Sequence, residues 1–118
     1  MDQITYADFS KIDFRVGQIL EAVKVPESEK LIRMRVDFGE MGVKTVYSGI
    51  YKWYKPEDLI NKKTVFVVNM VPKKIMGEES EAMIFAASAE ATDGQGSLIE
   101  TMSILLLEKE MKNGVKVF

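Results

Sequence analysis

Two adjacent lysines, Lys73 and Lys74, stand between two short apolar runs and carry the plainest chemistry in the sequence. A lysine ammonium group is a positive point charge with three donors, and it suits phosphate groups. Pro72 stops a strand because it lacks a backbone donor, and Gly77 allows a turn that other residues resist. We therefore predict a lysine-bearing loop between two paired strands, where binding residues concentrate. A plain hairpin with solvated lysines explains this pattern equally well.

The chain of 118 residues has no histidine and no cysteine. These absences exclude Ser-His-Asp catalysis, zinc-bound water, thiolate nucleophiles and disulfides. No phosphate-binding loop or dinucleotide glycine pattern is present either. Carboxylate pairs, a lysine base or a magnesium site remain open. We predict a binding protein with no catalytic residues, metal or cofactor.

Charge is distributed unevenly along the chain. Residues 30–74 contain ten basic and four acidic side chains, a net charge of +6, whereas the whole chain carries −2 and the rest therefore −8. A basic middle between acidic ends can steer an anion toward one face. Chance clustering is the alternative, because closeness in sequence need not produce one surface.

Length and composition favour one folded domain over residues 1–118, with 47% hydrophobic and 29% charged residues. No apolar run approaches the ~20 residues that cross a membrane. The first residues carry two aspartates and no apolar block, so no signal peptide is visible. Together with the missing cysteines, this predicts a soluble cytoplasmic protein.

A long first strand over 12–25 is predicted to bend in its middle. Its apolar register changes phase after Gly17, where Ile19, Val23 and Val25 become the apolar positions. Such a phase change is typical of a β-bulge, which lets one strand serve both sheets of a small barrel.

The following strands alternate clearly. Residues 31–38 place four apolar side chains on one face, namely Ile32, Met34, Val36 and Phe38, and leave Arg33 and Arg35 on the other. A turn at 39–42, a strand at 43–48, a helix beginning at Pro56 and a fourth strand at 64–69 follow. The arginine face either lines a groove for a nucleic-acid backbone or is an ordinary wet sheet face.

Apolar residues outside these strands predict further packing. Tyr6, Phe9 and Ile12 share one face of a short N-terminal helix or turn, and we expect them to pack inward as core or dimer contacts. Residues 89–96 read as a polar loop, 98–107 as either helix or buried strand, and 115–118 as a short final strand. This apolar load exceeds the needs of a small barrel and predicts a homodimer. Trp53 and Tyr54 could stack on bases, although closing the bottom of the barrel is the favoured interpretation.

Five short strands, a bent first strand and a helix between the third and fourth describe an all-β, five-stranded OB-fold barrel with short helices and a C-terminal extension. Several ordered motifs then resemble the tRNA-binding domain that occurs as freestanding dimers and attached to methionyl-tRNA synthetases. The chain is also similar to cytokine-like synthetase cofactors and to secretion-chaperone-like proteins. The motifs are DFRVG at 13–17, SEKL at 28–31, VDFG at 36–39, VYSGI at 46–50 and YKPEDL at 54–59.

The resemblance implies where RNA is bound. The family pattern of asparagine, proline, lysine, glycine, serine and methionine corresponds here to Asn69, Pro72, Lys73, Gly77, Ser80 and Met83. The implied RNA-contacting positions are Ser48, Asn69, Lys73, Ser80 and Met83, to which the charge distribution adds Lys30, Arg33, Arg35 and Lys74. Ala82 replaces a glycine that is usual in the family, and the nearby glutamates at 78, 79 and 81 would weaken phosphate attraction.

The resemblance further implies binding of tRNA by shape rather than anticodon sequence, with methionyl-tRNA synthetase as a possible partner for an accessory subunit. A chaperone-like peptide-binding module is the alternative, with Met70, Met76 and Met83 as an adaptable apolar surface. An enzyme that uses carboxylates is the third class.

Overall fold

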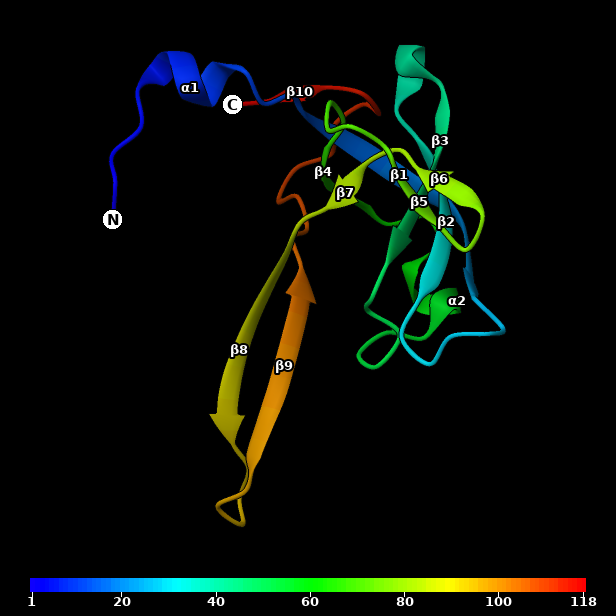
Figure 1. The fold of residues 1–118 in the computed structure, drawn as a ribbon, viewed down its shortest axis with the longest axis vertical. Coiled ribbons are helices and arrows are strands. Elements are labelled where there is room, and N and C mark those ends of the chain that lie inside the picture. Colours follow the sequence, from blue (N-terminus) through cyan, green and yellow to red (C-terminus); the bar gives the residue numbers. More distant parts are fainter.

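The computed structural model describes all residues, 1–118, and is built around one strongly curved antiparallel sheet (Figure 1). Five strands lie in the order β3-β2-β1-β4-β7, and this arrangement confirms the predicted OB-like barrel. The backbone nitrogen of Glu81, just before β7, donates to the oxygen of Thr45 in β3 at 2.8 Å and nearly closes the barrel. The strands are β1 Phe14–Lys24, β2 Ile32–Asp37, β3 Val43–Ser48, β4 Lys63–Val67 and β7 Met83–Ile84.

Strand β1 belongs to both halves of the barrel. Its first part pairs with β4 and its second part with β2, and the β1–β2 register shifts between Ile19 and Glu21. The predicted bulge therefore exists, but three residues beyond Gly17. Beyond this bulge the side chains exchange faces, so that Ala22 is buried and Val23 is 52% exposed. The prediction that Val23 faces the core is therefore wrong.

Gly17 serves packing instead. A Cβ atom at this position would lie 2.6 Å from side-chain atoms of both Phe38 and Val36. The ring of Phe38 meets that of Phe66 edge-on, with centroids 5.2 Å apart. Glycine is thus required because core side chains fill the space beside β1.

The predicted core face of β2 is confirmed. Its four apolar side chains, Ile32, Met34, Val36 and Phe38, are completely buried. Each such side chain contributes about 1.5–3 kcal/mol by leaving water. Two short helical segments complete the barrel: the 3₁₀ turn η1 Gly39–Met41 and helix α2 Pro56–Leu59, which begins with proline and buries Leu59.

The lysine segment differs from the predicted loop. Strand β4 ends at Val67, and the lysines lie on a strand of a small separate hairpin, β5 Lys73–Ile75 with β6 Glu78–Ser80. Met76 and Gly77 form its turn with φ angles of 52° and 83°. Two successive positive φ angles are characteristic of a type I′ hairpin turn, so the turn at Gly77 is confirmed. The predicted pairing of the strands on either side is also confirmed, since β4 pairs with β7, but a hairpin replaces the loop between them.

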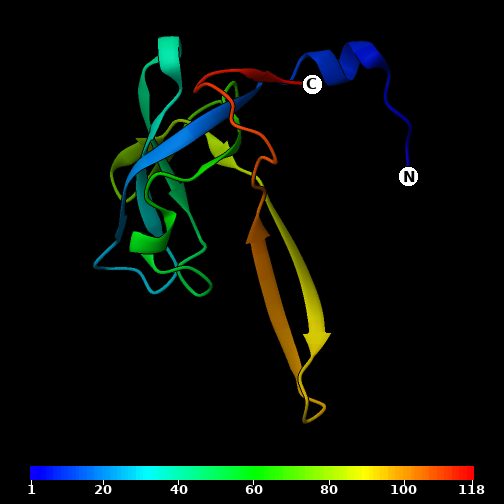
Figure 2. The ribbon, with the colours of Figure 1, turned by 180° about the vertical axis from the view of Figure 1, so that it is seen from behind.

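A second two-stranded ribbon, called the arm here, projects far from the barrel (Figure 2). It consists of β8 Ala86–Thr92 and β9 Leu98–Ile104, paired along their whole length. The prediction of a polar loop over 89–96 is wrong, because the actual turn is confined to the residues between the two strands. Of the two structures considered for residues 98–107, helix or strand, the strand is found: β9 covers Leu98–Ile104, and β8 supplies its backbone partners.

The segments at the two ends of the chain adjoin the first part of β1. Strand β10 Lys116–Val117 pairs with Phe14 and Arg15, which confirms the predicted final strand. Helix α1 Tyr6–Ser10, capped by Thr5 and Asp8, points away from the barrel. Neither α-helix has the length or apolarity needed to cross a membrane.

Inward packing of the N-terminal aromatic face is confirmed in part. Phe9 stacks on Phe14 at 5.6 Å between ring centroids, but Tyr6 is 79% exposed and Ile12 39%. A five-residue helix beyond the sheet edge has no core against which these two side chains can pack. Tyr54 packs against the core as expected, and its hydroxyl accepts a hydrogen bond from the nitrogen of Ile104 at 3.0 Å.

Candidate nucleic-acid interface

The β5–β6 hairpin is fastened to the outside of β3 by hydrogen bonds. The nitrogen of Thr45 donates to Glu81 Oε2 at 2.7 Å, and the nitrogen of Tyr47 donates to Ser80 Oγ at 3.0 Å. Ser80 is 8% exposed. Its hydroxyl therefore satisfies a backbone donor and holds the hairpin in place.

A cavity of about 160 Å³ lies between this hairpin and β3. It brings together three of the predicted residues, Lys73, Ser80 and Met83. Ala82, which replaces the family glycine, is 8% exposed and belongs to the lining. The complete lining is Tyr47, Met70, Val71, Lys73, Ile75, Ser80, Glu81, Ala82 and Met83.

The two lysines of the hairpin lie in different surroundings. Lys73 pairs with Ser80 on the face toward the cavity, whereas Lys74 pairs with Glu79 on the outer face. Both lysines are exposed, and neither belongs to any of the four ion pairs of the structure. Lys73 thus has no acidic cross-strand neighbour and offers the less compensated positive charge.

Beside the cavity, Arg33 of β2 forms a two-pronged ion pair with Glu78 of β6. Arg33 Nε donates to Glu78 Oε1 at 2.7 Å, and Arg33 Nη2 donates to Glu78 Oε2 at 3.1 Å. The hydroxyl of Tyr47 also donates to Glu78 Oε1, at 2.8 Å. One carboxylate therefore accepts three hydrogen bonds from two strands.

These contacts shift the pKa values of all three side chains. The hydrogen bonds from Arg33 and then Tyr47 lower the pKa of Glu78 to about 2. Burial, followed by the hydrogen bond to Glu78, raises the pKa of Tyr47, and the bond to Glu78 raises the pKa of Arg33. The carboxylate is thus ionised and the phenol protonated at neutral pH.

The other predicted residues lie around this site without lining it. Lys30 is exposed in the β1–β2 connection, Arg35 donates to Thr45 Oγ1 at 2.6 Å, and Ser48 ends β3. Asn69 is occupied in the fold: its Oδ1 accepts from the nitrogen of Asp13 at 2.8 Å, and its Nδ2 donates to the oxygen of Lys11 at 2.6 Å.

Sequence reasoning missed Tyr47 as a site residue. Alternation along β3 was the available signal, because buried Val46 places its neighbour Tyr47 on the opposite face, directly across from Arg33. The bonds to Ser80 and Glu78 could not be read from any local pattern.

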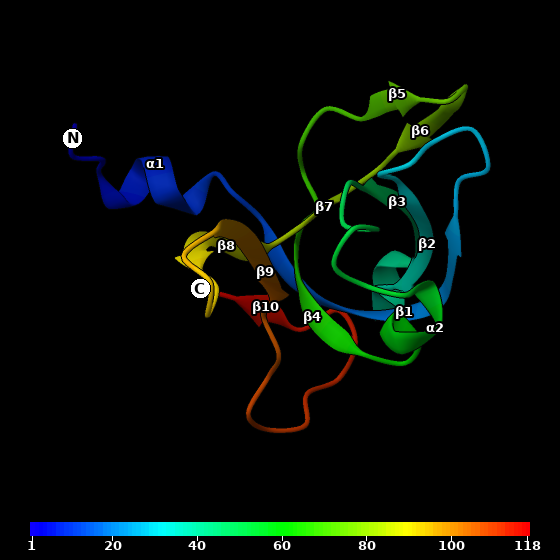
Figure 3. The ribbon, with the colours of Figure 1, turned by 90° about the horizontal axis from the view of Figure 1, so that it is seen from below.

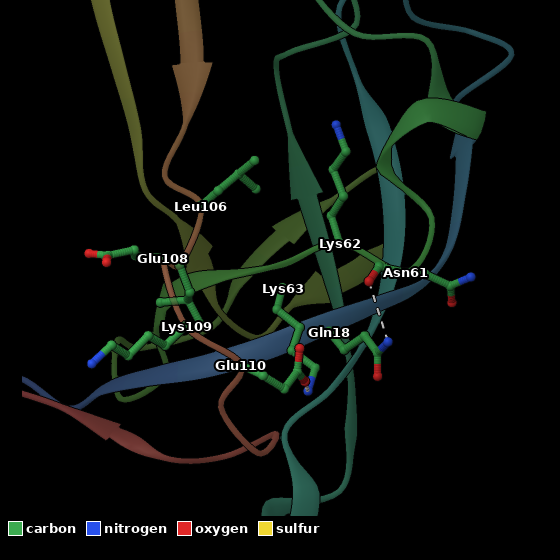
Figure 4. Close-up of a pocket in the computed structure, with 9 residues that line it drawn as sticks. Gln18, Asn61, Lys62, Lys63, Leu106, Glu108, Lys109 and Glu110 are labelled. Carbon is green, nitrogen blue, oxygen red and sulfur yellow. Dashed lines mark hydrogen bonds and ion pairs between the residues drawn. The ribbon is translucent and has the colours of Figure 1, made fainter.

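A larger open cleft of about 450 Å³ lies on the other side of the barrel, between β4 and the chain after β9 (Figure 3). Its charged side chains do not converge: Lys62, Glu108 and Lys109 point away in different directions (Figure 4). Lys63 is occupied by an ion pair with Glu110 and a 2.6 Å bond to the oxygen of Met111. No group of acidic side chains anywhere in the structure is arranged to hold a metal ion.

The sequence has close relatives. Methionine–tRNA ligases of Caldanaerobacter subterraneus and Pyrococcus horikoshii are 42% and 41% identical to it over 117 residues, or 99% of the chain. The matched part makes up only 17% and 15% of those ligases, so the chain spans about a sixth of these curated relatives.

Two solved structures cover the whole fold. A MetRS related protein from Pyrococcus horikoshii superimposes with a TM-score of 0.81 at 32% identity, covering 100% of both chains. A CsaA chaperone protein from Picrophilus torridus gives 0.78 at 36% identity, covering 98% of this chain and 100% of its own. A family model described as "Putative tRNA binding domain" matches residues 14–116, and the chain belongs to that tRNA-binding domain family.

Proposed function

We propose that residues 1–118 bind tRNA as one unit, without catalysis, through the β5–β6 hairpin and the adjoining faces of β2 and β3. The observation that carries this proposal is the position of Lys73 at the rim of a cavity, on a hairpin that backbone and side-chain hydrogen bonds fix to β3. Lysines neutralise RNA phosphates, and a rigid support lets them fit a folded RNA.

Recognition by this face depends on shape. Its lysines and arginines suit phosphate groups, and the amide of Asn69 is used within the fold. Phosphate contacts position an RNA but carry no sequence information. We therefore expect similar affinity for different tRNAs, with Lys30, Arg35, Ser48 and Met83 at the margins of the contact.

The protein works as a homodimer in this proposal, as an accessory subunit for aminoacylation in the cytoplasm and with methionyl-tRNA synthetase as a partner. Every residue of β8 is exposed, and so are the apolar side chains Leu98 and Ile99 of β9, at 75% and 47%. An isolated two-stranded ribbon is at best marginally stable in water and exposes unpaired edges. A second copy that covers the arm would remove this exposure and present two RNA-binding faces.

Titration of total tRNA at two salt concentrations tests the proposal. The affinity of a phosphate-binding surface falls steeply with salt. Binding of an apolar peptide does not weaken in this way. Absence of tRNA binding at low salt would overturn the proposal.

One observation favours a second candidate, a chaperone-like peptide-binding module. The cavity beside the hairpin is lined mainly by apolar side chains, and Met70, Met76 and Met83 around it are each about half exposed. Flexible methionines adapt to varied apolar partners. The salt titration separates the candidates, because only the RNA-binding surface responds steeply.

A further inference from the structure

The Arg33–Glu78–Tyr47 cluster adjoins the cavity but is not explained by the fold alone. The hairpin is already held to β3 by Ser80 and Glu81, so Glu78 is not needed to attach it. Glu78 instead directs a carboxylate at two donor groups of the barrel, the guanidinium of Arg33 and the hydroxyl of Tyr47.

The geometry of this contact is that of an oxyanion site. A guanidinium binds carboxylate and phosphate in the same two-pronged manner, and the Tyr47 hydroxyl adds a third donor. The donors converge from facing positions on β2 and β3, since Arg33 and Tyr47 are register partners. Rigid strands therefore fix the donor set independently of the hairpin.

The site is accessible from solvent. The side chains of Arg33 and Glu78 are 33% and 42% exposed. Glu78 directly follows the turn at Met76 and Gly77, so its side chain can swing outward while the Ser80 and Glu81 bonds remain. A partly exposed ion pair is weak in net terms, and an incoming phosphate can replace its carboxylate.

We propose that Arg33 and Tyr47 form a phosphate subsite that the carboxylate of Glu78 occupies in the free protein. Building on the proposed tRNA binding, an RNA phosphate displaces Glu78 and takes the same three donors. The Glu78 side chain is then an internal competitor that lowers affinity for RNA. Tyr47 belongs to this subsite and also lines the cavity that Lys73 lines, so Lys73 and the subsite can contact one RNA backbone.

The test replaces Glu78 by glutamine, which keeps the size of the side chain and removes its charge. We expect Glu78→Gln to bind total tRNA about threefold to tenfold more tightly at low salt. The slope of log affinity against log salt should stay close to that of the wild type, because the same phosphate contact forms in both complexes. Glu79→Gln is the matched control, since it removes the same charge from the outer face of the same hairpin.

A double-mutant cycle assigns the gain to Arg33. Replacement of Arg33 by alanine should weaken binding more in the Glu78→Gln background than in the wild-type protein, because only there is the guanidinium free before RNA arrives. Tyr47→Phe in the same background should remove part of the gain. Circular dichroism of each variant checks that the barrel is intact.

Three outcomes decide the matter. Weaker binding by Glu78→Gln than by wild type would make Glu78 an anchor and overturn the subsite. An equal gain from Glu78→Gln and Glu79→Gln would reduce the effect to net charge and also overturn it. Failure of the wild-type protein itself to bind tRNA would instead overturn the proposed function, and the subsite with it.

Discussion

The β5–β6 hairpin and the arm are both two-stranded antiparallel ribbons attached to one barrel, yet they are supported very differently. The hairpin lies against β3 and exchanges backbone and side-chain hydrogen bonds with Thr45 and Tyr47. The arm meets the barrel at its base, where the nitrogen of Ile104 donates to the Tyr54 hydroxyl, and farther along β9, where the oxygen of Glu100 accepts from Trp53 Nε1 at 3.3 Å. Every residue of β8 is exposed. The hairpin is thus held in one position by the barrel, whereas the apolar side chains of Leu98 and Ile99 on the arm stay exposed. The proposed dimer rests on this difference.

The largest expected effect concerns the arm. Leu98→Asp combined with Ile99→Asp would place charges where a dimer buries apolar side chains, so the dimer should dissociate. Light scattering at micromolar concentration should then give one chain mass of 13.4 kDa in place of about twice that value. Val71→Asp, at a side chain 91% exposed beside the hairpin, is the matched control and should leave the mass unchanged. A wild-type mass of 13.4 kDa would contradict the dimer.

The next effect distinguishes the two hairpin lysines. Lys73→Ala should lower affinity for total tRNA and make the salt slope shallower by ~0.7–0.9, the value for one lost phosphate contact. Lys74→Ala should do less, because Lys74 lies on the outer face of the hairpin, directly across from the acidic Glu79. The double variant should lose affinity for different tRNAs to similar extents. Unchanged affinity and slope in the double variant would move the electrostatic anchor to Arg33 and Arg35.

A moderate effect is expected at Ser80, which fastens the hairpin. Ser80→Ala leaves the Tyr47 nitrogen without its acceptor and should cost about 1–3 kcal/mol of unfolding free energy. Thermal unfolding measures this as a lower Tm. Ser88→Ala, the same change on the exposed arm, should have no measurable effect. Any loss of tRNA affinity in Ser80→Ala or Met83→Ala should leave the salt slope nearly unaltered, because neither changes charge.

The smallest effect is a pH dependence at Glu78. Its pKa is lowered from 4.5 to about 2 in the folded protein by Arg33 and then Tyr47. The stabilisation is therefore fully present above about pH 4.5 and disappears as pH falls toward 2. The difference in Tm between wild type and Glu78→Gln should shrink across this window and vanish at its acid end. A difference independent of pH would show that the carboxylate charge is not involved.

Local patterns predicted the barrel well because its strands alternate strictly. The face of β2 from Ile32 to Phe38, the helix starting at Pro56 and the strand after Gly114 all follow from side-chain periodicity and turn residues. The predicted bulge near Gly17 is confirmed, with the register shift three residues beyond it. The change of apolar phase at Gly17 itself reflects core packing there.

The two ribbons were the parts that sequence patterns could not specify. The segment with Lys73 and Lys74 was predicted as a loop, because the strand there depends on pairing within a short hairpin. That hairpin is held by a hydrogen bond from Tyr47, which is far away in the chain. The sequence of the arm was interpreted as a polar loop followed by an ambiguous segment, because β8 is rich in alanine and has no buried face. Long-range partners decided both structures.

The pairing of β10 with the start of β1 has a consequence for how the chain folds. Lys116 lies opposite Arg15, and Gly114 donates from its nitrogen to the oxygen of Val16 at 2.7 Å, so the first strand receives one of its neighbours from the last residues. Gly114 approaches so closely that a Cβ there would lie 2.2 Å from the oxygen of Phe38. During synthesis β1 can therefore become fully paired only after residues 114–117 have left the ribosome. Contacts between such distant residues are slow to form, which predicts folding in the range of ~milliseconds to seconds.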